Sequence, residues 1–87
     1  MSAYLTVNEA NAVDEVIRLY KLPLTLTDDD SQFIDCESSK VMSVQEGLSE
    51  ILDAVEADPQ LFLSISDSER AEFISALASN KVIIVNE

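Results

Sequence analysis

The chain has 87 residues, with 17 Asp plus Glu against 5 Lys plus Arg and a formal net charge of -12. This charge disfavours contact with nucleic acid or anionic lipid and favours a basic protein surface as the partner. The apolar share of 47% excludes a disordered acidic tail, because such tails lack the aliphatic residues that build a core. The length predicts a single compact acidic domain over residues 1–87.

The single cysteine, Cys36, excludes an internal disulfide framework and a Cys-rich zinc site, and it fits a reducing compartment. Its neighbours Asp35 and Glu37 are acidic and cannot stabilise a thiolate, so we predict a small buried or half-buried side chain. No segment approaches the ~18 to 20 apolar residues that span a bilayer, and the amino terminus lacks a signal-peptide pattern. We therefore expect a cytoplasmic protein with no membrane partner.

One helix-start pattern, a hydroxyl residue followed three positions later by Glu, occurs three times. It stands at Thr6–Glu9, Ser43–Glu46 and Ser66–Glu69. In each pair the hydroxyl can accept from an amide of the first turn, while the Glu reaches back to the amide of the cap residue. Apolar residues at helical spacing follow each pair, so the sequence predicts three helices.

The first predicted helix covers about residues 7–21 and ends before Pro23, because the residue before a proline is pushed out of the helical region. Its apolar residues recur at steps of three and four, which predicts one buried face. That face contains Ala10, Val13, Val16, Ile17 and Tyr20.

A hairpin is predicted next, with strands at about 24–27 and 32–36. The first strand alternates apolar and β-branched polar residues, and the segment 28–31, Asp-Asp-Asp-Ser, has the composition of a turn.

The second predicted helix covers about residues 44–57. It carries Val44, Leu48, Ile51, Leu52 and Val55 on one side. Its glycine, Gly47, weakens a helix by about 1 kcal/mol relative to alanine, so tertiary packing must hold this element. Asp58 and Pro59 follow as a cap residue and a first-turn proline. The segment that follows, up to residue 65, is either a short helical turn that begins at Pro59 or an extended piece, and the cap favours the turn.

The third predicted helix covers about residues 67–79. We expect it to bury one broad face made of Ala71, Phe73, Ile74, Leu77 and Ala78. The β-branched run Val82–Val85 predicts a strand at about 81–85. The three helices and a small antiparallel sheet make an α+β fold, and an unpaired edge of the sheet at this C-terminal strand offers a place for a second copy.

Catalytic chemistry is excluded step by step. The chain has no histidine, which removes Ser-His and Cys-His nucleophilic arrangements, and its sole glycine leaves no phosphate-cradling loop. The run Asp28 to Asp30 resembles the start of a calcium loop, but Phe33 replaces the required glycine and Ser39 replaces the bidentate Glu. We expect no enzyme, no cofactor and no metal site.

The acids form a pattern that folding alone does not require. Between Lys40 and Arg70 there are seven acids and no base. Glu46, Glu50 and Asp53 fall on one side of the second predicted helix, opposite its apolar face, about 5 to 6 Å apart along the axis. Further candidate binding residues are Glu69 and Glu72 on the third helix and Asp28, Asp29 and Asp30 in the hairpin.

These features predict a small acidic protein-binding module, an inhibitor or adaptor that docks on a basic surface of another protein. In size and charge, though in no motif, the chain resembles the DNA-mimicking anti-restriction and anti-CRISPR proteins of phages, which implies a nucleic-acid-binding site as the target surface. The alternative hypothesis is a structural or assembly component, a homo-oligomer or an assembly chaperone, which works through an apolar surface while its acids keep it dissolved.

Overall fold

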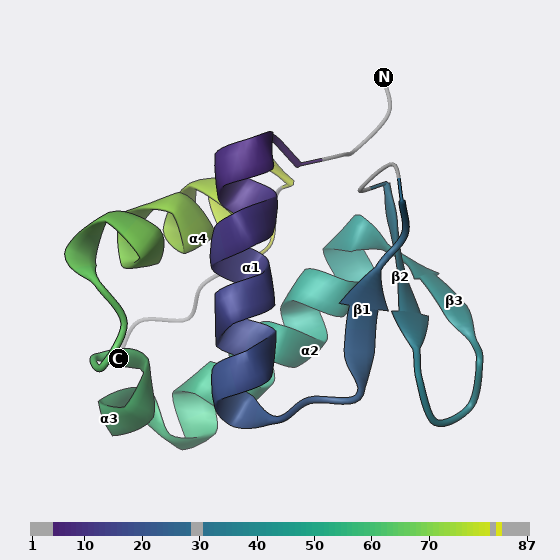
Figure 1. The fold of residues 1–87 in the computed structure, drawn as a ribbon, viewed down its shortest axis with the longest axis horizontal. Helices are drawn as coiled ribbons and strands as arrows, with labels where there is room; N and C mark the ends of the chain where they lie inside the picture. Colours follow the sequence, from purple (N-terminus) through teal and green to yellow (C-terminus); the bar gives the residue numbers. More distant parts are fainter. Residues whose placement is uncertain (1–4, 29–30, 81, 83–87) are drawn as a thin grey trace.

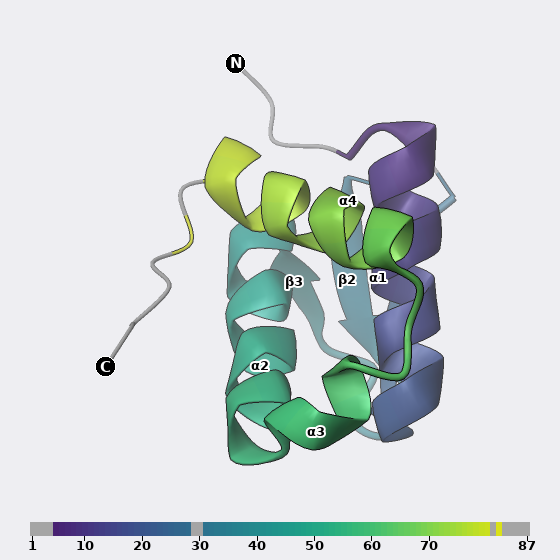
Figure 2. The ribbon, with the colours of Figure 1, turned by 90° about the vertical axis from the view of Figure 1, so that its left-hand side faces the viewer.

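The computed structural model describes residues 5–28, 31–80 and 82. Its elements follow the order α1, β1, β2, β3, α2, α3, α4. Helices α1 (Val7–Tyr20) and α2 (Val44–Ala57) lie alongside each other, and the sheet flanks them on one side (Figure 1). Helix α4 (Asp67–Ser79) crosses at one end of the pair and the short α3 (Pro59–Phe62) lies at the other (Figure 2). The predicted α+β class is confirmed.

The ends of the helices follow the predicted start signals. The reciprocal capping box is present at Thr6 and Glu9 of α1 and at Ser43 and Glu46 of α2. At α4 the Ser66 hydroxyl accepts from the Glu69 amide as predicted, but it donates to Glu69 Oε1 in place of the second backbone bond. Satisfying these orphan amides makes the start of each helix a local property of the sequence.

Helix α1 ends one residue earlier than predicted. Lys21 adopts a left-handed conformation with φ 55° and ψ 45°, and its amide donates to the Arg18 carbonyl. The amide of Leu22 then reaches back to the Ile17 carbonyl at 3.0 Å. Such a left-handed residue closes a helix by satisfying its last carbonyls, so the helix stops before Pro23 is reached.

The sheet has three antiparallel strands in the order β1-β2-β3. The predicted hairpin is confirmed with slightly shorter strands, β1 (Leu24–Leu26) and β2 (Gln32–Asp35). The third strand, β3 (Val41–Ser43), was not predicted, and it pairs with β2 so that Phe33 lies opposite Met42. The predicted strand at 81–85 lies outside the described residues except for Val82, which is buried and belongs to no strand.

Helix α2 buries the face that its sequence predicts. Val44, Leu48 and Ile51 are almost fully enclosed, and Leu52 and Val55 are also buried. Gly47 faces β2 so closely that a Cβ at this position would overlap the ring of Phe33, which is itself fully buried. The glycine is therefore a close-approach position between helix and sheet, where the intrinsic cost to the helix is offset by packing.

The prediction for the buried face of α4 is partly wrong. Phe73, Leu77 and the unpredicted Ala76 are buried, whereas Ala71, Ile74 and Ala78 are exposed. Periodicity could not separate these sets, because both lie at helical spacing and both are apolar. The packing of α4 onto α1 decides between them, since only one side of a helix at the edge of the molecule meets the core.

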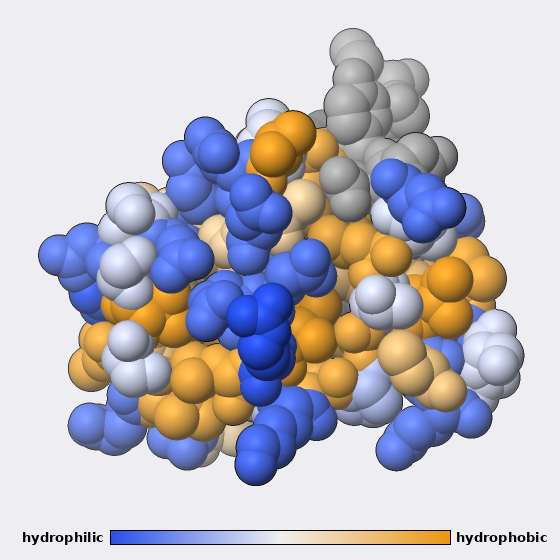
Figure 3. Space-filling view, in the orientation of Figure 1, coloured by the Kyte–Doolittle hydropathy of each residue, from blue (hydrophilic) through white to orange (hydrophobic). Residues whose placement is uncertain are grey.

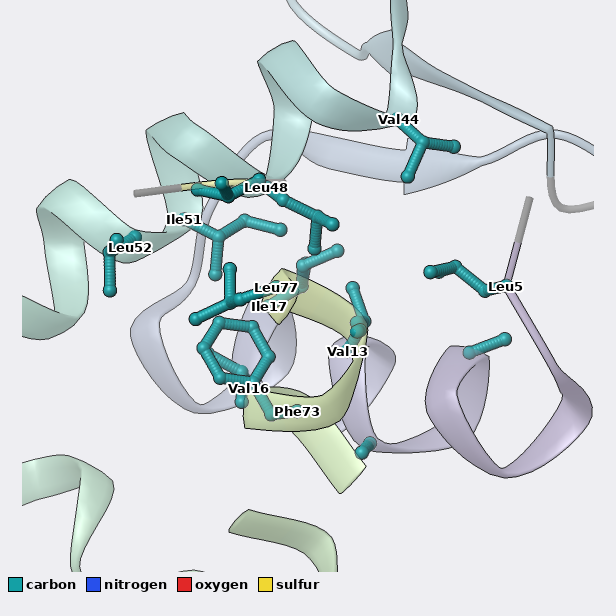
Figure 4. Packing of buried hydrophobic residues seen from close by; sticks show 14 of the residues in the cluster. Leu5, Val13, Val16, Ile17, Val44, Leu48, Ile51, Leu52, Phe73 and Leu77 are labelled. Carbon is teal, nitrogen blue, oxygen red and sulfur yellow. The ribbon is translucent and has the colours of Figure 1, made fainter. Parts of the chain in front are cut away.

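The core forms where α1, α2 and α4 converge. Val13 and Val16 from α1, Leu48 and Ile51 from α2, and Phe73 and Leu77 from α4 point toward one another (Figure 4). The predicted helical turn after Pro59 is confirmed as α3, and its Phe62 packs edge-on against Phe73 with ring centroids 5.6 Å apart. Helix α3 thus closes the core below α4.

The prediction of a buried or half-buried Cys36 is wrong, since the thiol is free and exposed. Cys36 follows β2 at the start of the turn toward β3, where Glu37, Ser38 and Ser39 are also exposed. Turns of this kind run over the surface, where a small side chain stays accessible to solvent.

Candidate functional site

The candidate site is the solvent side of α2, and we call Glu46, Glu50 and Asp53 the α2 acid line. All three residues are exposed, and the buried face of Leu48 and Ile51 lies on the opposite side of the helix. Helical geometry spreads the three carboxylates over about 10 Å along the axis. Glu56, one turn beyond Asp53, is exposed as well and extends the acidic surface toward the end of the helix.

The members of the α2 acid line differ in what they do for folding. Glu46 accepts from the Ser43 amide at 3.3 Å and so serves the helix cap. Within the described part of the chain, the carboxylates of Glu50 and Asp53 have no hydrogen-bond or ion-pair partner. These two charges are therefore available to an external cation at no cost to the fold.

Both described arginines form ion pairs within their own helices. Arg18 pairs with Glu15 of α1 at 3.0 Å, and Arg70 pairs with Asp67 of α4. Both pairs join residues three apart on one helix, so they neutralise charge locally, and neither arginine pairs with the α2 acid line. Exposed carboxylates without a neighbouring base produce a negative potential that attracts a basic surface over a Debye length of about 10 Å at 0.1 M salt.

Glu69 and Glu72 lie on a different part of the molecule from the α2 acid line. They line a shallow groove of about 370 Å³ together with Asn8, Asn11 and Ala12 of α1. Both side chains are half-buried there. The structure therefore places this acidic pair with α1, and it does not continue the α2 acid line.

The hairpin acids are also separate. Asp28 is exposed in the turn after β1, and Asp29 and Asp30 lie outside the described residues. Strand β1 packs against α1, whereas α2 packs against β2 and β3. Figure 3 looks at the α1 side, where hydrophilic side chains follow α1 between hydrophobic surface over α3 and over the sheet; α2 lies behind this view.

Glu9 has a structural role that the sequence predicted only in part. Glu9 is only 6% exposed, although the sequence identified it as a capping residue. Its Oε1 accepts from the Thr6 amide at 3.1 Å, and its Oε2 accepts from the Ser75 hydroxyl of α4 at 2.8 Å. The capping pattern indicated the first bond, but nothing in the sequence indicates the second, because Ser75 is 66 residues away.

Tyr20 makes a comparable connection at the other end of α1. Its hydroxyl donates to the carbonyl of Asp58, the residue that caps α2, at 2.5 Å. Burial raises the pKa of the Tyr20 phenol above its usual 10.0, and the nearby Asp58 charge raises it further. Both effects disfavour the phenolate, so the neutral donor is the form that the fold selects.

In the ranges that the structure describes, no group of three or more Asp, Glu or Cys side chains could hold a metal ion. No helix in the same ranges is long and apolar enough to cross a bilayer. Comparison with protein-family models, with curated proteins and with solved structures finds no match to this chain.

Proposed function

We propose that the chain is a small acidic protein-binding module of the cytoplasm that docks its α2 acid line on a basic surface of another protein, as an inhibitor or adaptor. The observation that carries the proposal is the pair Glu50 and Asp53. Both carboxylates are exposed, have no hydrogen bond or ion pair to another described residue, and lie in a segment, 41 to 69, that contains no base. A surface that serves only solubility mixes both signs, with a net charge of about 2 to 8 for a small domain.

The spacing of the acids favours a limited form of nucleic-acid mimicry. Duplex DNA presents one charge per about 1.7 Å of its axis. The α2 acid line presents one per about 5 Å, and the acids of the groove, Glu69 and Glu72, lie with α1 and do not extend it. We therefore favour complementarity to a Lys/Arg-rich patch, such as one edge of a nucleic-acid-binding site, over imitation of a whole duplex.

Capture from the native host with two versions of the chain tests this proposal. The bait variant Glu50→Lys with Asp53→Lys reverses two exposed charges that form no hydrogen bond or ion pair with another described residue, so it should fold as the wild type does. A matched control, Asp28→Lys with Glu37→Lys, changes the net charge equally at the hairpin. We expect the wild type and the hairpin control to retain a basic protein at low salt, and the α2 variant to lose it.

Kinetics on the captured protein sharpen the result. Reversing the two α2 charges should lower the association rate constant at low salt by about tenfold or more, and the difference should shrink at high salt. Equal losses for the α2 and the hairpin variants would show that net charge alone attracts the partner, and the role assigned to α2 would then be wrong.

A further inference from the structure

We draw no further inference here: the strongest candidate, the groove between α1 and the first turns of α4 that Glu69 and Glu72 line with Asn8 and Asn11, rests on an acidic cluster alone, with nothing in the described part of the chain that points to a ligand.

Discussion

Helices α2 and α4 have similar lengths and similar start signals. The sequence predicts the buried face of α2 correctly, but that of α4 only in part. In α2 the apolar residues and the acids fall on opposite sides, and the structure buries the first set and exposes the second. In α4 apolar residues occur around most of the helix, and the structure buries Phe73, Ala76 and Leu77 while leaving Ile74 exposed. Helical periodicity therefore predicts the buried face of a helix only when polar residues occupy the opposite side.

The difference also bears on function. The exposed side of α2 is acidic, whereas the exposed side of α4 includes apolar residues. The two kinds of surface lie on different helices. Mutations can therefore address one surface without disturbing the other.

The largest expected effect distinguishes the two faces of α4. Phe73→Ala should lower the free energy of unfolding by about 3 to 5 kcal/mol, because it leaves a cavity beside Phe62 and in the core. Ile74→Ala should lower it by less than about 1 kcal/mol, because that side chain is half exposed. Urea denaturation at low protein concentration measures both, and similar losses would contradict the orientation of α4.

A smaller effect is expected where α2 meets the sheet. Gly47→Ala improves helix propensity by about 1 kcal/mol, but its methyl group must displace the enclosed ring of Phe33, at a typical cost of about 1 to 3 kcal/mol. We expect a net loss of up to about 2 kcal/mol. Ser49→Ala, at an exposed position of the same helix, is the control and should not destabilise. A stabilising Gly47→Ala would contradict the close approach.

Removing the hydrogen bond between Ser75 of α4 and Glu9 of α1 should have a smaller effect on stability. Ser75→Ala removes the hydroxyl that donates to the buried Glu9 carboxylate, and we expect a loss of about 1 kcal/mol in thermal or urea unfolding. Ser79→Ala, also exposed on α4, removes a hydroxyl without that contact and is the control. Equal effects of the two substitutions would show that the bond to Glu9 does not stabilise the fold.

The smallest effect is expected for the hydrogen bond between Tyr20 of α1 and Asp58 at the end of α2. Because the pKa of Tyr20 is raised in the folded state, the unfolded chain releases the phenolic proton first. The stabilisation is complete below pH 10.0 and is lost as the pH rises from there through the folded pKa. Unfolding followed between about pH 8 and pH 11 should show a steeper decline for the wild type than for Tyr20→Phe. Parallel declines would contradict a role of the phenol.

The sequence predicted those parts of the fold that depend on neighbours in the chain. The starts of α1 and α2 follow from Thr6 and Ser43 with their Glu partners, and the short turn of α3 follows from Asp58 and Pro59. The hairpin was predicted because alternation and a turn composition occur together. Strand β3 was missed because three residues between a turn and a helix carry too short a pattern to be recognised.

The sequence also predicted only part of the candidate site. The exposure of Glu46, Glu50 and Asp53 was readable in advance, since one amphipathic helix contains all three and its apolar side fixes their direction. The placement of Glu69 and Glu72 in a groove against α1 was not readable, because it depends on how two helices far apart in sequence cross. Whether either acidic surface binds a partner stays a prediction.

By itself the sequence determined the acidic charge, the helices with their caps and the face that α2 buries, because capping and periodicity act over three or four residues. Only the tertiary structure decided which side of α4 meets the core. It also decided that the buried Glu9 accepts a hydrogen bond from Ser75 and that the ring of Phe33 packs directly against Gly47. These outcomes depend on contacts between segments that are distant in the chain, and the free energy of packing selects among arrangements that local patterns leave equivalent.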